Sequence, residues 1–436
     1  MQRAMFSTAR RMTSHKAKKR SPNVVVRIFR LMGPGVITGA ADDDPSGIAT
    51  YSIAGAQLGT RLLWTSLLTW PLMGAVQMMC ARIGMVTGEG LASALRKRIP
   101  RWICVVFVFA LLIANTINVG ADLSGMADAA ELLTGLNSHI FVIAFGTLIA
   151  VVTVKFRYHQ IARVLKWLVL SLGAYVLTSF FTRPDWKAVF HDTLVPSWPS
   201  DRETWGTIVA ILGTTISPYL FFWQAAQEVE EEKAMGRRMV IVREGATSSE
   251  ILNRKIDVGL GAFFSNVVMF FVILCCATTL HKHGITNISS TKEAAEALRP
   301  LAGKFATLLY TTGLIGVGCL AIPTLAGSAA YAFAETFDWT EGLDKPFEGA
   351  HEFYLALILS IGCGIVMDFL NLSPIKTLYW TAIINGLLAP FLLVGVYLVA
   401  TDAKLMKHQT SSWLNRFVVL LTIAAMFGAG VALFFV

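Results

Sequence analysis

Three consecutive aspartates, Asp42, Asp43 and Asp44, interrupt an apolar stretch and are followed by Pro45 and a Ser-Gly pair (GAADDDPSGIATYSIAG). An aspartate in the middle of a membrane costs about 3 kcal/mol or more without a partner, so it marks a functional site by default. Proline removes a backbone donor and Gly47 frees the chain, so the segment predicts a helix that unwinds in mid-span. Unwound backbone at that depth is tolerated only where it is buried in protein or lines a wet cavity. The stretch therefore predicts a cation site inside a membrane domain.

A second interpretation is that the helix begins at Pro45 and the aspartates cap it at the membrane surface. The run 31–41 is apolar and glycine-rich and leads directly into the aspartates, which disfavours this interpretation. Asp42 and Asp43 keep two interpretations: they line a vestibule that attracts cations, or they cap the second half-helix.

A second interruption lies in the stretch TIVAILGTTISPYLFFWQAAQEVEEE, where Gly213 and Pro218 break an equally apolar run. Paired broken helices at matching places in two inverted halves point to a midplane substrate site in a secondary transporter. Freed backbone carbonyls and a carboxylate at such a site can hold a cation. The acidic end of this stretch, from Glu228 to Glu232, is expected to be solvated.

The elements that position these breaks are membrane helices. The chain is 55% hydrophobic and 15% charged, with a mean hydropathy of +0.59, whereas a soluble protein carries about 25% charged residues. Apolar windows of about 20 residues, long enough to cross a bilayer, recur along the chain, and no alternating barrel pattern appears. We expect an all-α integral membrane protein with eleven spans, at 33–59, 62–86, 102–132, 139–154, 161–181, 204–227, 256–280, 305–334, 353–370, 375–400 and 413–436.

The broken spans are the first and the sixth, so each begins a five-helix half of opposite topology. We expect a basic tail at 1–32 and one transporter domain at 33–436, with repeats at about 33–181 and 204–400 and an extra helix at 413–436. About three quarters of the 37 Lys and Arg fall on one side when the N-terminus is placed in the cytoplasm. This predicts a plasma membrane protein, in a bacterial inner membrane, with its C-terminus outside. The positive charge is a topology signal, and nothing indicates nucleic-acid binding.

The chain resembles the NRAMP divalent-metal transporters in four places. These are Gly33-Pro34-Gly35, the aspartate-proline break, the T-x-x-x-P break, and the segment ADLSG with Asp122. The resemblance implies the LeuT-type fold, with two inverted five-helix repeats and one extra helix. It also implies a metal site at the two breaks, where the family carries D-P-G-N and M-P-H.

Mapped onto this chain, the resemblance implies a set of metal ligands that keeps the family's aspartate. The thioether of the family's methionine and the amide oxygen of its asparagine are lost. The family's aspartate corresponds to Asp44, its asparagine to Gly47, its methionine to Ser217, and its histidine to Tyr219. The two backbone carbonyls would belong to Ala41 and Thr214. Gln224 could face the ion or its water shell, although an interhelical hydrogen bond is the commoner role, and Asp122 would stand in the second shell.

Loss of the thioether changes the expected ion. Soft sulfur favours transition metals, whereas carboxylate, carbonyl and hydroxyl oxygens suit hard ions. Mg²⁺ keeps several waters and touches one or two carboxylates, which suits the space left by Gly47 and Ser217. The chain thus resembles the magnesium-transporting branch of the family, and we expect both Mg²⁺ and Mn²⁺ to be carried as substrates, with no prosthetic group.

Ion movement is not expected to require proton coupling. Tyr219 occupies the position of the histidine that relays protons in the family. A tyrosine side chain has an ordinary pKa of about 10. The acidic partner of Asp122 is replaced by Gly125, and the ninth span has no arginine. The alternatives are a proton-coupled Mn²⁺/Fe²⁺ symporter and a LeuT-type carrier of organic solutes. No H-E-x-x-H or G-x-S-x-G motif is present, so an enzyme is not expected. A monomer is adequate, and the oligomeric state stays open.

Overall fold

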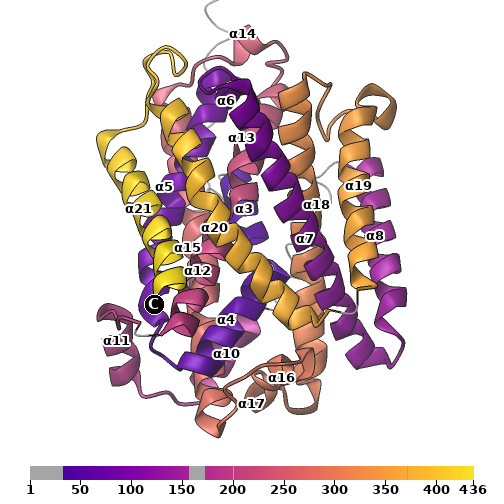
Figure 1. Cartoon of the computed structure of the whole chain (residues 1–436), viewed down its shortest axis with the longest axis vertical. Helices are drawn as coiled ribbons and strands as arrows, with labels where there is room; N and C mark the ends of the chain where they lie inside the picture. The colour runs from indigo at the N-terminus through magenta and orange to yellow at the C-terminus, as the bar shows by residue number, and fades with distance from the viewer. Residues whose placement is uncertain (1–32, 157–171, 200, 371) are drawn as a thin grey trace, which may run out of the picture.

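The computed structural model describes residues 33–156, 172–199, 201–370 and 372–436, and these residues contain helices and loops without a β-strand. The helices run along the long axis of the molecule, with short helices at both ends (Figure 1). The longer helices are α3 Pro34–Asp42, α4 Pro45–Leu58, α5 Leu63–Thr87, α7 Arg101–Thr134, α8 Ser138–Lys155, α10 Gly173–Phe181, α12 Arg202–Thr215, α13 Pro218–Ala234, α15 Ser248–Thr279, α18 Ala306–Phe337, α19 His351–Asp368, α20 Pro374–Thr401 and α21 Trp413–Phe435. The short ones are α6 Leu91–Arg96, α11 Trp186–Leu194, α14 Val240–Arg243, α16 Thr291–Glu296 and α17 Arg299–Ala302.

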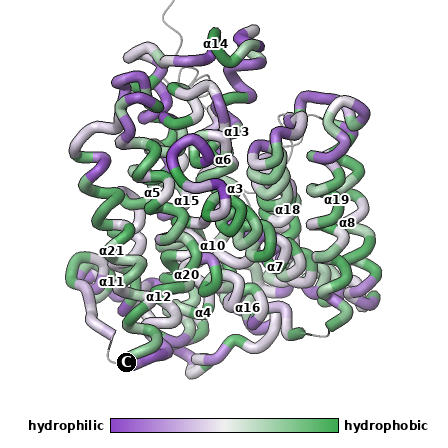
Figure 2. The backbone as a smooth tube through the Cα atoms, turned by 45° about the horizontal axis from the view of Figure 1, so that its top comes forward, coloured by the Kyte–Doolittle hydropathy of each residue, from purple (hydrophilic) through white to green (hydrophobic). Residues whose placement is uncertain are grey.

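Eight stretches of the described chain are long and apolar enough to cross a membrane. The remaining predicted spans correspond to the broken pair α3 and α4, to α5, and to the span at 161–181. Of that last span, 161–171 lies outside the described residues and 173–181 is α10. Hydrophobic residues line the helices through the middle of the molecule, and hydrophilic residues gather in the segments at its ends (Figure 2). The all-helical membrane fold expected from composition is therefore confirmed.

Both predicted breaks are present. The first separates α3 from α4 at Asp43 and Asp44, and the second separates α12 from α13 at Ile216 and Ser217. Pro45 and Pro218 each occupy the first turn of the second half-helix, where a missing N–H costs no hydrogen bond. The prolines thus start new helices and stop the old ones from continuing.

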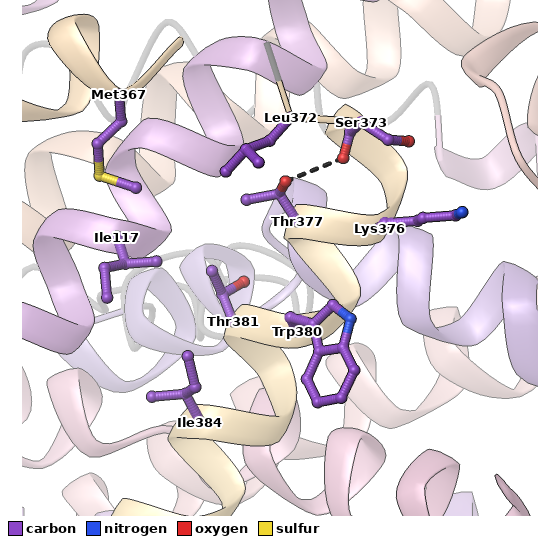
Figure 3. A pocket seen from close by; sticks show the side chains of 9 residues that line it. All are labelled: Ile117, Met367, Leu372, Ser373, Lys376, Thr377, Trp380, Thr381 and Ile384. Carbon is purple, nitrogen blue, oxygen red and sulfur yellow. Dashed lines mark hydrogen bonds between the residues drawn. The ribbon is translucent and has the colours of Figure 1, made fainter. Parts of the chain in front are cut away.

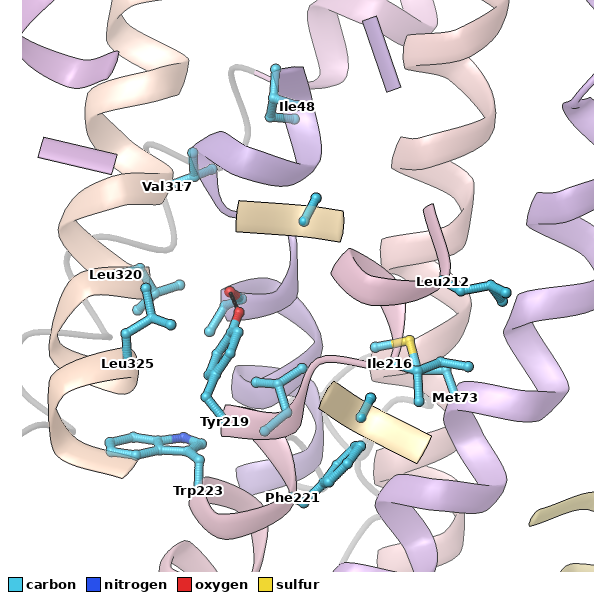
Figure 4. Close-up of a cluster of buried hydrophobic side chains, with 14 of the residues drawn as sticks. Ile48, Met73, Leu212, Ile216, Tyr219, Phe221, Trp223, Val317, Leu320 and Leu325 are labelled. Atoms are coloured by element: carbon cyan, nitrogen blue, oxygen red, sulfur yellow. Dashed lines mark hydrogen bonds between the residues drawn. The ribbon is translucent and has the colours of Figure 1, made fainter. Parts of the chain in front are cut away.

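Close helix packing brings the two broken helices into the core. α3 and α4 pack on α15, and α12 packs on α20. Small residues allow this approach: an added Cβ on Gly213 would stand 2.0 Å from the carbonyl oxygen of Ala382. Large buried side chains fill the space around the breaks, with Tyr219 and Trp223 of α13 beside Leu325 of α18 (Figure 4).

Candidate functional site

Asp44 is the most heavily hydrogen-bonded side chain of the first break. It is the N-cap of α4, and its Oδ1 accepts from the Gly47 amide at 2.7 Å and from the Ser46 hydroxyl at 2.6 Å. Its other oxygen, Oδ2, accepts from the amide of Asn118 on α7 at 3.1 Å. The side chain is 2% exposed. A buried carboxylate with three donors is fixed in direction, and its oxygens keep lone pairs free for an ion.

Asp42 and Asp43 turn away from that group toward α15. The Ser265 hydroxyl lies 2.8 Å from Asp42 Oδ2 and 3.2 Å from Asp43 Oδ1, and the second oxygen of Asp42 has no hydrogen-bond partner. Neither aspartate caps α4, because Asp44 has that role. The capping interpretation of Asp42 and Asp43 is therefore wrong, and the vestibule interpretation stays a prediction.

Asp122 lies on the same face of α7 as Asn118, one helical turn further along. It is fully buried, and its polar neighbour is the backbone amide of Ser46 in the first turn of α4. Because Asn118 reaches Asp44 and α7 packs against α4, this face of α7 is turned toward the first break.

At the second break, the Ser217 hydroxyl hydrogen-bonds to the end of α12. Its Oγ lies 2.7 Å from the Gly213 carbonyl oxygen and 2.6 Å from that of Thr214. A hydroxyl has a single hydrogen to donate, so these carbonyls share it. Ser217 thus satisfies the end of α12, where carbonyls would otherwise lack partners.

Two hydrogen bonds join the breaks to each other. The Tyr219 hydroxyl donates to the Ala41 carbonyl oxygen at 2.9 Å, and the Thr214 hydroxyl donates to the Tyr51 hydroxyl at 3.2 Å. Figure 4 shows Tyr219 rising from α13 toward the first broken helix. Two positions expected to supply ligand carbonyls, Ala41 and Thr214, therefore lie on either side of the same gap. Each carbonyl oxygen has a second lone pair that an ion could use.

Gln224 lies apart from this group. Its Nε2 donates to Glu228 Oε1 at 2.7 Å, and its Oε1 has no partner although the residue is fully buried. Glu228 in turn pairs with Arg254 of α15 at 2.7 Å and is 1% exposed. The expectation of a solvated acidic end to α13 is wrong for Glu228, because α15 covers this face of the helix.

No group of three or more His, Cys, Asp or Glu side chains in the described part of the chain could hold a metal ion. An ion at the breaks would therefore meet at most two such side chains, supplemented by neutral oxygens and water. Neither Asn118 nor Tyr51 is among the residues that the sequence predicted for the site. Asn118 and Asp122 are four residues apart on one helix, and this spacing was the signal in the sequence that could have identified Asn118.

The chain is similar to known proteins over most of its length. A family model described as natural resistance-associated macrophage protein-like (Nramp) matches residues 35–436. A divalent metal cation transporter MntH from Caldanaerobacter subterraneus subsp. tengcongensis is 24% identical over 406 residues, which cover 89% of each chain. MntH from Yersinia pestis is 27% identical over 305 residues, 68% of this chain and 71% of its own.

Solved structures share the fold. A manganese transporter of Eremococcus coleocola, in complex with an aromatic bis-isothiourea compound, superposes with a TM-score of 0.74 at 16% identity, over 94% of this chain and 87% of its own. Mhp1, a nucleobase-cation-symport-1 family transporter in a closed conformation, gives 0.58 at 15% identity, over 92% and 90%. The fold is thus of the LeuT type, with helices one and six broken.

Proposed function

Because the chain belongs to the Nramp family, we propose that it moves divalent cations, Mg²⁺ as well as Mn²⁺, across a cell membrane by alternating access. The proposed direction is inward, with the N-terminus in the cytoplasm and the C-terminus outside. The proposed ion site lies between the two breaks, with Asp44 as the charged ligand. Ala41, Thr214, Ser217 and Tyr219 would supply neutral oxygens or order the ion's water.

The observation that carries the proposal is the chemistry around Asp44. Its hydrogen-bond partners are a hydroxyl, a backbone amide and a side-chain amide. The hydroxyls of Ser217 and Tyr219 donate to carbonyl oxygens. Hard oxygen donors with a single carboxylate suit Mg²⁺, which retains much of its water, and they also bind Mn²⁺. A carboxylate here would repel an anionic organic substrate, which disfavours a carrier of amino acids.

Transport without obligatory proton coupling is the second part of the proposal. Tyr219 stands where the resemblance implies a histidine, and its hydroxyl is engaged by the Ala41 carbonyl. The described helix α19 contains no arginine. The membrane potential alone supplies about 2.3 kcal/mol per charge per 100 mV for inward movement of a cation.

A proton-coupled Mn²⁺/Fe²⁺ symporter is the alternative, and Asp122 favours it. A fully buried carboxylate is costly when charged. Binding and release of a proton at Asp122 would relieve that cost in one half of a transport cycle.

Ion uptake by proteoliposomes tests both parts. We expect wild-type protein to carry Mn²⁺ and Mg²⁺ while a pH-sensitive dye trapped inside reports no acidification. Asp44→Asn keeps the shape of the side chain and removes its charge, so uptake of both ions should fall at least tenfold. Asp185→Asn is the control, because Asp185 is an exposed N-cap of α11 and asparagine caps equally well.

Undiminished uptake by Asp44→Asn would refute the ligand role. Acidification that accompanies Mn²⁺ uptake in wild type, and disappears in Asp122→Asn, would replace the uncoupled mechanism by the symporter.

A further inference from the structure

A groove on the flank of the helix bundle is not part of the ion site. It has a volume of about 380 Å³ and lies between α7, α19 and the first turns of α20. Its lining residues are Ile117, Met367, Leu372, Ser373, Lys376, Thr377, Trp380, Thr381 and Ile384. Figure 3 shows Met367 and Ile117 on one side and the α20 residues on the other. We refer to it as the α20 groove.

The walls of the α20 groove are apolar and open to the surface of the bundle. Leu372 is 55% exposed and Trp380 is 59% exposed. The two hydroxyls deeper in the groove are already engaged within α20, since Thr377 donates to the Ser373 carbonyl and Thr381 to the Leu378 carbonyl. An exposed apolar channel on the side of a membrane protein faces lipid tails, and an acyl chain is the occupant whose chemistry matches it.

One positive charge stands at the rim. Lys376 is exposed, and among the described residues no carboxylate pairs with it. Asp368, the acidic residue at the end of α19, is engaged elsewhere: its two oxygens meet His139 Nδ1 at 2.5 Å and the Ser124 hydroxyl at 2.7 Å. Lys376 and Trp380 are four residues apart, so they lie on one face of α20 beside the groove.

The start of α20 adds to this positive potential. Its N-cap residue, Ser373, makes no side-chain capping hydrogen bond. The first amides of a long helix carry a partial positive charge and attract anions such as phosphate. The helix start and the Lys376 ammonium therefore both favour an anionic group at the rim, whereas the apolar walls of the α20 groove favour hydrocarbon.

We propose that the α20 groove binds one anionic phospholipid. The headgroup phosphate lies at Lys376 and Ser373, and one acyl chain runs past Trp380 between Met367 and Ile384. The combination of a cationic rim and an apolar channel selects a phospholipid over a soluble phosphate, which would leave the channel unfilled, and over a zwitterionic lipid, whose net charge is zero.

The location gives such a lipid a route to influence the bundle. Ile117, in the wall of the groove, precedes Asn118, whose amide binds Asp44. A lipid wedged between α7 and α20 would press on the helix that orients the proposed ligand.

Lipid retention measured by native mass spectrometry tests the proposal. The full chain is reconstituted in nanodiscs of equal phosphatidylglycerol and phosphatidylcholine, then released into detergent. We expect wild type to retain phosphatidylglycerol with about tenfold preference. Lys376→Gln should lose that preference, and Lys304→Gln, which alters another exposed lysine near the start of α18, should keep it.

Tail placement is tested separately with brominated phosphatidylglycerol, which quenches nearby tryptophans. The quenched part of the fluorescence should be smaller in Trp380→Phe than in wild type. Equal retention of both lipids by wild type, unchanged preference in Lys376→Gln, or identical quenching with and without Trp380 would each overturn the assignment.

Discussion

Asp44 combines a structural role with the proposed functional one. With Oδ1 it caps α4, and with Oδ2 it meets Asn118 of α7. Capping holds the carboxylate against the first turn of α4, and the partners offset the cost of its burial. A ligand fixed in this way loses little entropy on binding an ion.

The proposed selectivity depends on Gly47 and Ser217, and both residues can be exchanged. A Cβ on Gly47 would lie 3.5 Å from Asp44 Oδ1 and 3.4 Å from the Tyr51 ring, which is ordinary contact, so a Cβ is accommodated there. The double variant Gly47→Asn with Ser217→Met restores an amide oxygen and a thioether. We expect the ratio of Mn²⁺ to Mg²⁺ uptake to rise about tenfold, because sulfur prefers the softer ion.

Initial rates with each ion alone, in proteoliposomes, give this ratio. Gly47→Ala paired with Ser217→Met is the control for the amide oxygen, since it adds a Cβ at the same place. A ratio that does not move in either double variant would mean that softness at these positions does not set selectivity.

At the scale of elements, the positions of the two breaks depend on how closely the half-helices pack against their neighbours. α12 approaches α20 so closely that a Cβ on Gly213 would meet the Ala382 carbonyl oxygen at 2.0 Å and the Gly386 nitrogen at 2.4 Å. Backbone atoms cannot rotate away as a flexible side chain can. The position of α12, and with it that of Ser217, is therefore set by a glycine on α12.

Gly213→Ala should lower the free energy of unfolding by about 1–3 kcal/mol, the usual cost of overpacking. Thermal unfolding of the purified protein in detergent measures it as a lower Tm. Gly206→Ala on the same helix is the control, because its Cβ would meet the Tyr379 hydroxyl at 3.4 Å, an ordinary distance. Similar Tm values for both variants would contradict the packing argument.

At the scale of the whole molecule, one ion-pair network ties the free ends of both broken helices to α15. Asp257 accepts from the amides of Gly33 at 2.8 Å and Gly35 at 2.7 Å, at the start of α3. Arg254 pairs with Asp257 at 2.6 Å and with Glu228 of α13 at 2.7 Å, and it also pairs with Glu231. Alternating access in this fold moves helices around a fixed site, so movement of α3 away from α15 has to break these contacts.

Arg254→Gln should therefore loosen α3. It removes the charge that links Asp257 to Glu228 and leaves the acids uncompensated. We expect hydrogen exchange at the backbone amides of α3 (34–42) to become about tenfold faster, as measured by mass spectrometry. Lys255→Gln, at the exposed neighbouring position of α15, should leave exchange unchanged. Equal protection of α3 in Arg254→Gln and wild type would show that the network does not hold this end.

The sequence by itself determined the membrane helices and the two breaks, because hydropathy, proline and glycine act on the local backbone conformation. Pro45 and Pro218 each stand in the first turn of a half-helix, where a missing N–H costs no hydrogen bond. It also identified Asp44 as the costly charge. Its estimate of the fifth span cannot be compared at 161–171, which lies outside the described residues.

Only the tertiary structure decided which groups meet. Asn118 reaches Asp44 across 74 residues, Tyr219 reaches Ala41 across 178, and Glu228 is covered by Arg254 of α15. These contacts depend on the crossing of helices and on glycines that let backbones touch, and periodicity within one helix carries no information about its neighbours. Burial of the acidic end of α13 was therefore missed, whereas the breaks themselves were predicted.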